Sequence, residues 1–319
     1  MDSRRLGASD LVVSEICLGS WLTYGGGVEE GVARRCVERA LELGITFFDT
    51  ANVYGRGSAE EVLGRALAGR PRDAYVLATK LFFPMSETDR GLSRAQVETQ
   101  LDASLRRLRT DHVDLYQCHR FPQDMDFEET LGALTDLVAQ GKIRYLGSST
   151  YPAAQIVRAQ WVARERGLHR FVCEQPPYSM LTRGIEADVL PTCLEHGMGV
   201  IPWSPLGGGW LSGRWRKGAE DLTSRRSAMI PARYDLSIPA NQAKLEAADA
   251  LGALADETGI SLIHLALAFV LRHPGVTAAI IGPRTMEQLE SQLGAADLAL
   301  DDAVLDRIDE IVPPGTTIN

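Results

Sequence analysis

The sequence has few cysteines, no long apolar run and no excess of positive charge. Its five cysteines among 319 residues form no C-x-x-C pair, which disfavours a disulfide scaffold, so we expect reduced core thiols and no metal site. The arginine-bearing N-terminus is not followed by a signal-peptide apolar segment, and no stretch reaches membrane-spanning length. A net charge of −9 argues against a nucleic-acid surface. We therefore expect a cytoplasmic protein without membrane insertion.

A dinucleotide-binding glycine loop is also missing. An open Rossmann sheet requires G-x-G-x-x-G at its first strand–helix turn. Here that turn reads G-S-W-L-T-Y-G-G-G, and Gly25, Gly26 and Gly27 have the wrong spacing. The missing loop disfavours an open doubly wound sheet with a dinucleotide-binding site.

Short apolar runs alternate with amphipathic helical segments along almost the whole chain. Eight strand–helix units can be counted, with an irregular interruption at 207–239 and no linker that would split them. Repeated units of this kind close into a (β/α)₈ barrel at this length, so we predict an α/β TIM barrel spanning 1–319 as a single domain. The predicted strands are 16–18, 46–48, 75–78, 113–116, 143–146, 171–173, 199–202 and 277–281.

Two helix starts carry the pattern of a capping box. Ser58 with Glu61 predicts a helix through Leu67, and Ser93 with Gln96 predicts the next one. A further helix is predicted from 285 to 296, after the last strand.

Four chemically active side chains come at or just after successive predicted strands: Asp49, Tyr54, Lys80 and His119. In a barrel the carboxyl ends of the strands meet at one face, where catalytic groups gather. A phenol with an ordinary pKa of about 10 is a weak acid, and a lysine held by an aspartate could stabilise its phenolate. A neutral histidine could orient a carbonyl oxygen. The alternatives are a structural Asp–Lys ion pair, an aromatic anchor and a core histidine.

The remaining strands are also followed by polar or aromatic residues or by glycine: Trp21, Ser149, Gln175, Trp203 and Gly282. Solvated loops often begin with polar residues, so any one of these would be ordinary. A group at every strand end favours a site at the barrel mouth. Trp21, Phe82, Met85 and Trp210 could line an apolar pocket or serve as packing residues.

These residues stand in segments that resemble the aldo-keto reductases from Arg5 to about Pro313. The segments are D-T-A-x-x-Y-G at 49–55, A-T-K at 78–80, Y-Q-C-H-R at 116–120, G-S-S-T at 147–150, E-Q-P-P-Y at 174–178, W-S-P-L at 203–206 and I-I-G-P-R at 280–284. The resemblance implies a (β/α)₈ barrel, a nicotinamide cofactor across its mouth, and Asp49, Tyr54, Lys80 and His119 as the catalytic tetrad with Tyr54 as proton donor.

The resemblance also implies the residues that bind the cofactor. Ser149, Thr150 and Gln175 correspond to the binding site of the nicotinamide carboxamide, although the family more often has Asn at the position of Thr150. Trp203 corresponds to the aromatic that stacks on the nicotinamide, and Trp21 and Asp49 are also expected to contact the cofactor. The pyrophosphate loop would hold Ser204, Leu206 and Gly208, although the run 207–209 could instead be a plain flexible loop.

The adenosine end of the cofactor would lie at the last strand. Many family members have Lys where Gly282 stands, so Arg284 would have to bind the 2′-phosphate, beside a helix start at Thr285. Further residues implied are Gln288 and Gln292 for the adenine, and Arg214 and Arg225 on a stretch that folds over the cofactor in one branch; ordinary surface arginine is the alternative for the last two. NADPH is therefore expected rather than NADH.

Two functions follow from the resemblance. The W-L-T-Y-G-G segment at 21–26 is similar to the branch of potassium-channel β-subunits and their bacterial reductase relatives, and W-S-P-L-G-G-G is similar to reductases of keto-sugars. The first expectation is an NADPH-dependent reductase of a small aldehyde or ketone, which a tetrad with His119 favours. The alternative is a nicotinamide-binding regulatory subunit of a channel-like partner with vestigial catalysis. The chain could also assemble with copies of itself.

Overall fold

Eight parallel strands form one curved sheet at the centre of the molecule. The computed structural model describes residues 1–21, 23–25, 27–219 and 223–318, and the side chain of Arg225 also lies outside the described part. The strand order is β10-β3-β4-β5-β6-β7-β8-β9. Their bounds are β3 (Ile16–Gly19), β4 (Phe47–Asp49), β5 (Val76–Leu81), β6 (Val113–Cys118), β7 (Ile143–Ser148), β8 (Phe171–Glu174), β9 (Gly199–Val200) and β10 (Ala279–Ile281).

The sheet closes into a barrel through a short seam between its first and last strands. Parallel bridges join Val200 to Val276 and Trp203 to Ile280. Backbone hydrogen bonds support them, from the Thr277 N–H to the Val200 carbonyl at 2.8 Å and from the Ile280 N–H to the Pro202 carbonyl at 3.0 Å. The predicted (β/α)₈ barrel and its eight strand positions are confirmed.

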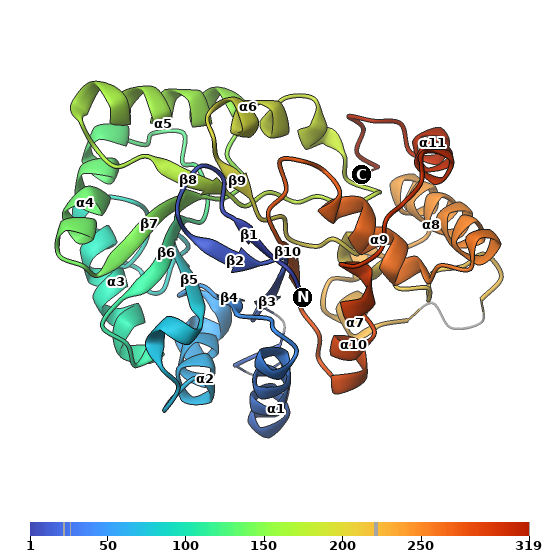
Figure 1. Cartoon of the computed structure of the whole chain (residues 1–319), viewed down its shortest axis with the longest axis horizontal. Coiled ribbons are helices and arrows are strands. Elements are labelled where there is room, and N and C mark those ends of the chain that lie inside the picture. The colour runs from blue at the N-terminus through green and yellow to red at the C-terminus, as the bar shows by residue number, and fades with distance from the viewer. Residues whose placement is uncertain (22, 26, 220–222, 319) are drawn as a thin grey trace.

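Helices cover the outside of the barrel between consecutive strands (Figure 1). They are α1 (Glu30–Glu42), α2 (Ser58–Ala66), α3 (Arg94–Leu108), α4 (Phe127–Ala139), α5 (Ala153–Arg166), α6 (Val189–Glu195), α9 (Leu262–Leu271) and α10 (Met286–Glu290). Two more, α8 (Pro239–Thr258) and α11 (Asp302–Ile311), pack against each other. Among the described residues no single helix is long and apolar enough to cross a membrane; only α8 and α9 taken together, bent by 98°, pass that test.

An antiparallel hairpin, β1 (Ser3–Arg5) and β2 (Val12–Ser14), lies across one end of the barrel (Figure 1). Its buried Leu6 and Val13 share a core cluster with the inward side chains Phe47 and Leu115. The hairpin therefore closes the end of the barrel that is opposite to the carboxyl ends of the strands. This hairpin was not predicted from the sequence.

Neither predicted capping box forms. The helix α2 begins at Ser58 itself, and the Ser58 hydroxyl donates to the carbonyls of Gly25 at 3.0 Å and Gly55 at 2.7 Å. Ser93 is the residue before α3 as predicted, but it makes no side-chain cap, and the Gln96 amide donates to the Thr88 carbonyl. The Ser58 hydroxyl and the Gln96 amide therefore bond to backbone carbonyls outside their own helices.

Two segments differ in secondary structure from the prediction, because each contains more than one short helix. The irregular stretch after β9 contains the short helices η4 (Gly207–Gly209), α7 (Arg225–Met229) and η5 (Pro231–Arg233). Trp210 is buried, stacks on Tyr234 at a centroid distance of 5.4 Å and packs at a tilt against Trp215 at 4.4 Å, so it is a packing residue of the loop. The helix predicted for 285–296 is split into α10 and η6 (Leu293–Ala295).

Candidate active site

A buried lysine and aspartate form the base of the site. Asp49 ends β4 and Lys80 lies one strand away on β5, where the parallel register brings both to the barrel interior. The Lys80 ammonium donates to Asp49 Oδ1 at 2.5 Å and to the Thr50 carbonyl at 2.9 Å, and Lys80 has no exposed surface. Burial lowers the pKa of Lys80, but Asp49 and Tyr54 outweigh it and the net direction is upward. The lysine is therefore a fixed cation.

Tyr54 lies above this pair in η1 (Tyr54–Gly57), the turn that leads into α2. Its hydroxyl accepts from the Lys80 ammonium at 3.3 Å, and the ammonium also lies 4.9 Å from the centre of the Tyr54 ring. Burial raises the pKa of Tyr54 above its ordinary value, while Lys80 acts in the opposite direction. The phenol therefore holds its proton at neutral pH, and Lys80 favours the phenolate that remains once the proton is given up.

His119 follows β6 directly and completes the group. Its Nε2 is 3.5 Å from the Tyr54 hydroxyl, and the two rings meet edge to face at 5.5 Å. Burial, with the charges of Lys80 and Arg120, lowers the pKa of His119 well below its ordinary value, so the imidazole is neutral. Its buried Nδ1 has no hydrogen-bond partner among the described residues. The structure thus brings all four predicted side chains together at one end of the barrel.

Two glutamines hold the second oxygen of Asp49. The side-chain amides of Gln117 and Gln175 donate to Asp49 Oδ2 at 3.2 and 2.9 Å, and Gln175 also donates to the Gln117 side-chain oxygen at 3.2 Å. Gln175 was predicted as a nicotinamide contact, and here it also orients the carboxylate. Gln117 was missed, although a glutamine inside a predicted buried strand was a signal for it.

The turn after β7 carries Ser149 and Thr150 toward the same place. The Ser149 hydroxyl donates to the Gln175 carbonyl at 2.9 Å, and Thr150 has a positive φ of 58°, which L-residues rarely adopt. The buried carboxylate of Glu174 holds this turn, accepting from the Ser148 hydroxyl and from the Tyr151 N–H at 3.1 Å. The turn is therefore fixed by a side chain that the prediction did not include.

The loop after Trp203 has a shape that glycine alone adopts easily. Gly207, Gly208 and Gly209 have φ values of 58°, 73° and 105°. The Gly207 N–H donates to the Ser204 carbonyl at 2.9 Å, and the Tyr234 hydroxyl donates to the Gly208 carbonyl at 2.7 Å. The loop with Ser204 and Leu206, predicted to hold the pyrophosphate, thus forms a hydrogen-bonded turn.

An arginine that was not predicted faces this loop. The Arg226 guanidinium lies 5.0 Å from the centre of the Trp21 ring, and its Nη1 would be 3.8 Å from a Cβ at Gly208. Burial, together with Arg233 and Arg284, lowers the pKa of Arg226, and its buried Nε has no hydrogen-bond partner among the described residues. A buried nitrogen that lacks an acceptor fits a phosphate oxygen there.

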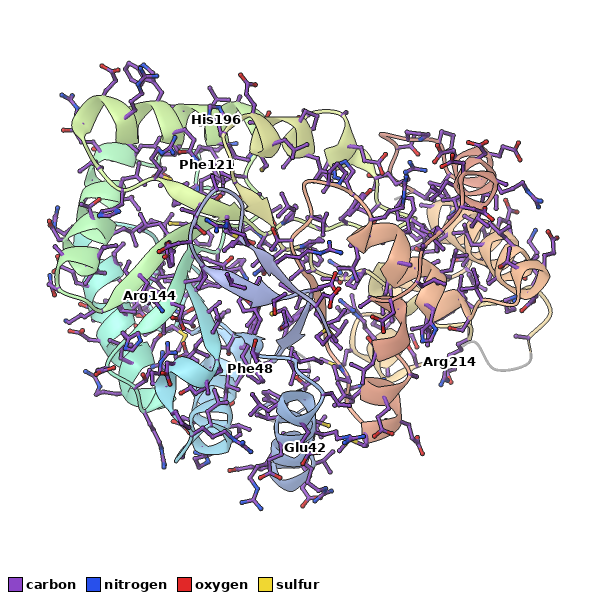
Figure 2. All side chains as sticks on the ribbon, viewed as in Figure 1. Glu42, Phe48, Phe121, Arg144, His196 and Arg214 are labelled. Atoms are coloured by element: carbon purple, nitrogen blue, oxygen red, sulfur yellow. The ribbon has the colours of Figure 1, made fainter. Side chains whose placement is uncertain are left out.

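Two other predicted arginines lie in the same stretch. Arg214, labelled in Figure 2, donates to the Thr223 carbonyl at 2.6 Å and so ties the stretch to itself. Arg225, predicted for the cofactor, has a side chain outside the described residues. The sequence S-R-R at 224–226 could not show which arginine of the pair turns toward the glycine loop.

The predicted adenosine end follows β10. Arg284 precedes the Thr285 cap of α10, and the Arg284 N–H donates to the Gln288 side-chain oxygen at 2.9 Å. The Gln292 amide donates to the Gln288 carbonyl at 2.5 Å, and Gln292 is buried. The two glutamines predicted for the adenine therefore make hydrogen bonds within their own segment, whereas Arg284 lies close enough to Arg226 to affect its pKa.

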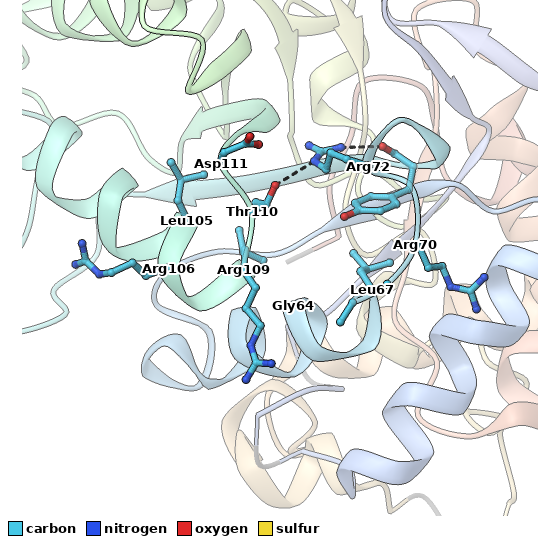
Figure 3. A pocket seen from close by; sticks show the side chains of 13 residues that line it. Gly64, Leu67, Arg70, Arg72, Leu105, Arg106, Arg109, Thr110 and Asp111 are labelled. Carbon is cyan, nitrogen blue, oxygen red and sulfur yellow. Dashed lines mark hydrogen bonds between the residues drawn. The ribbon is translucent and has the colours of Figure 1, made fainter.

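Two cavities open at the far end of the barrel, before the strands begin. One of about 590 Å³ is lined by Arg72, Tyr75 and Thr110, and Arg72 Nε donates to the Thr110 hydroxyl at 3.3 Å (Figure 3). The other, of about 560 Å³, lies beside Arg4 and His273. No predicted site residue among those described lines either one, so we assign no catalytic role to them.

Comparisons with known proteins agree with this geometry. Residues 15–313 match the model of the Aldo/keto reductase family. The chain is 38% identical over 328 residues to the uncharacterized oxidoreductase YrpG of Bacillus subtilis, covering 99% of this chain and 97% of that protein. It is 35% identical over 318 residues to a putative voltage-gated potassium channel subunit beta of Schizosaccharomyces pombe, covering 97% and 92% of the two chains. A probable subunit of the same kind from Arabidopsis thaliana is 34% identical over 325 residues, covering 98% and 97%.

Proposed function

Because this chain belongs to the aldo/keto reductase family, we propose that it is an NADPH-dependent reductase of aldehydes or ketones with Tyr54 as its proton donor. The family match and the related oxidoreductase support an oxidoreductase. The observation that supports the finer one is the contact of the Tyr54 hydroxyl with Lys80 at 3.3 Å and His119 at 3.5 Å.

The tetrad has the parts that carbonyl reduction requires. When bound, the reduced nicotinamide supplies a hydride to the carbonyl carbon. Tyr54 donates its proton to the oxygen that becomes negative, and Lys80 stabilises the resulting phenolate. Asp49 keeps Lys80 charged and fixed, because buried ammonium groups require a paired acid. Neutral His119 can donate a hydrogen bond from Nε2 to the same oxygen, and so position the carbonyl beside the phenol.

The residues at the barrel mouth fit a phosphate-bearing nicotinamide cofactor. Trp203 would stack on the nicotinamide, with Ser149, Thr150 and Gln175 at its carboxamide. The turn from Ser204 through Leu206 to Gly208 would hold the pyrophosphate. The Arg226 guanidinium, whose buried Nε has no hydrogen-bond partner among the described residues, lies beside Gly208 of this turn. Arg284 would bind the 2′-phosphate and so distinguish NADPH from NADH.

A second function remains a candidate because two of the relatives are named as potassium channel β subunits. In that case the chain would bind the nicotinamide cofactor and report its redox state to a channel-like partner. A neutral histidine beside the phenol favours catalysis.

Oxidation of NADPH by the purified protein tests the proposal. A panel of aldehydes, ketones, dicarbonyls and keto-sugars is compared with NADPH alone, and the alcohol is identified by mass spectrometry. The proposal predicts carbonyl-dependent oxidation with one alcohol formed per NADPH. Tight NADPH binding without any turnover across the panel would instead favour the regulatory subunit.

A further inference from the structure

One cation at the active site has no role in the proposed reduction or in the predicted cofactor binding. Arg120 follows His119 directly, and its half-buried guanidinium lies 5.5 Å from the centre of the Phe83 ring. The same Phe83 ring meets the His119 ring at 4.9 Å, edge to face. Arg120 also influences the pKa of both Tyr54 and His119, lowering each. The guanidinium is therefore beside the place where the carbonyl must bind.

Most of the hydrogen-bonding capacity of Arg120 is unused by the described residues. A guanidinium has five N–H donors. The hydrogen bonds that Arg120 makes both come from Nη1, to the His119 carbonyl at 2.7 Å and to the Thr150 hydroxyl at 3.1 Å. Both acceptors are neutral. Within the described chain, no carboxylate lies at ion-pair distance from Arg120.

The nearby buried acid does not neutralise this cation. Glu174 is bound by the Ser148 hydroxyl and the Tyr151 N–H. Burial raises the pKa of Glu174 to about 7, so at neutral pH much of it is uncharged. Burial in turn lowers the pKa of Arg120, which reflects the cost of a half-buried charge without an acid partner. A substrate anion would offset that cost.

We propose that Arg120 is a specificity-determining residue that binds a carboxylate located a few bonds from the reacting carbonyl, so that the preferred substrates are oxo acids. This inference rests on the proposed function. The planar fork of a guanidinium matches the two oxygens of a carboxylate, and the Phe83 ring holds the fork in orientation. The carbonyl end lies at Tyr54 and His119, while the carboxylate end lies at Arg120.

The test is the ratio of kcat/KM for charged and neutral aldehydes of similar shape. The pairs are 4-carboxybenzaldehyde with 4-carbamoylbenzaldehyde, and 4-oxobutanoate with pentanal. Wild type should prefer the charged member of at least one pair, and Arg120→Met should reduce that ratio about ten- to a hundredfold, the range for hydrogen bonds to charged groups. Arg120→Lys keeps the charge without the fork and should recover only part of the preference.

Arg158→Met is the matched control. Arg158 is exposed on α5, and its guanidinium likewise lies over a phenylalanine ring, 5.2 Å from the centre of the Phe127 ring. It should leave the ratio unchanged. If Arg120→Met lowered kcat/KM for the charged and the neutral aldehyde by the same factor, Arg120 would only position the turn at Thr150. That result would overturn the proposal. Equal use of charged and neutral aldehydes by wild type would do the same.

Two further arms separate the remaining outcomes. D-glyceraldehyde 3-phosphate against glyceraldehyde tests phosphate as the anion, and a preference for phosphate with none for carboxylate would contradict the oxo-acid assignment. Benzoate against benzamide is measured by the thermal midpoint, independent of turnover. Benzoate should stabilise wild type but not Arg120→Met. If no carbonyl is reduced but benzoate still stabilises wild type and not Arg120→Met, the proposed function fails while Arg120 remains an anion site. If benzoate affects both proteins equally, the inference is overturned.

Discussion

At the scale of single residues, the proposed reduction depends on the protonation state of the Tyr54 phenol. Burial raises the pKa of Tyr54, and the charge of Lys80 lowers it by a smaller amount. The reduction requires the protonated phenol, so activity is present below the pKa of Tyr54 and is lost as pH rises through it. The position of that alkaline limb therefore reports the charge next to the phenol.

Lys80→Met removes this charge and should raise the pKa of Tyr54 further, which moves the alkaline limb of kcat to higher pH while lowering the maximal rate. The measurement is a pH–rate profile together with circular dichroism to confirm folding. Lys142→Met, which breaks an ion pair with Asp102 on the outside of the barrel, is the control. An alkaline limb at the wild-type position in a folded Lys80→Met protein would mean that Lys80 is structural only.

Arg284→Ala tests which residue distinguishes the two cofactors. Loss of a charge-assisted contact with the 2′-phosphate should weaken NADPH binding by roughly 1.5–3 kcal/mol, about ten- to a hundredfold, and leave NADH nearly unchanged. Arg226→Met is the comparison, because a pyrophosphate contact is common to both cofactors and both should weaken. Dissociation constants can be measured by tryptophan fluorescence, since Trp203 is expected to stack on the nicotinamide. If Arg284→Ala weakened the binding of NADPH and NADH equally, Arg284 would not be the residue that binds the 2′-phosphate.

At the scale of elements, the turn between β7 and α5 is held by a buried acid at the end of β8. The pKa of Glu174 is raised by burial from 4.5 to about 7. Between about pH 4.5 and 7 the native state keeps this proton and the unfolded chain has lost it. This contribution to stability is therefore fully present below the window, falls across it by up to about 1.4 kcal/mol per pH unit, and is lost above it.

Glu174→Gln should remove this component of the pH dependence. Chemical unfolding of wild type and variant from pH 4.5 to 8 gives the difference in unfolding free energy, which should shift in favour of the variant as pH rises. Glu195→Gln, exposed at the end of α6, should follow the wild-type curve. A constant difference between wild type and Glu174→Gln would show that Glu174 ionises normally in the fold.

Most elements, and the four side chains that the structure brings together, could be predicted from the sequence because both depend on local pattern. Apolar runs predicted the eight strands, and the residues after them predicted the tetrad. The capping boxes failed because Ser58 and Gln96 bond to backbone carbonyls outside their own helices, which the capping-box pattern does not reveal. Arg226 was missed because an irregular stretch has no periodicity to show which side chain turns inward. The hairpin at the barrel end was missed because each of its strands has three residues.

At the scale of the whole molecule, the two ends of the barrel carry different groups of residues. The hairpin buries Leu6 against the interior side chains at one end, and the tetrad lies at the other. Leu6→Ala should therefore lower the free energy of unfolding by about 2–5 kcal/mol through the cavity it leaves. Denaturant unfolding measures the loss. Val12→Ala, on the exposed face of the same hairpin, should change it by no more than about 0.5 kcal/mol. Equal effects of both substitutions would mean that the hairpin does not close the barrel core.

The central claim is that Tyr54 delivers the proton in an NADPH-dependent reduction, and Tyr54→Phe tests it most directly because the ring stays and the hydroxyl goes. The measurement is the rate of NADPH oxidation with the best carbonyl of the panel, alongside the NADPH dissociation constant of the same preparation. The account predicts a fall in rate of about 10²–10⁴-fold with NADPH binding little changed. A Tyr54→Phe protein that turns over at the wild-type rate would contradict it.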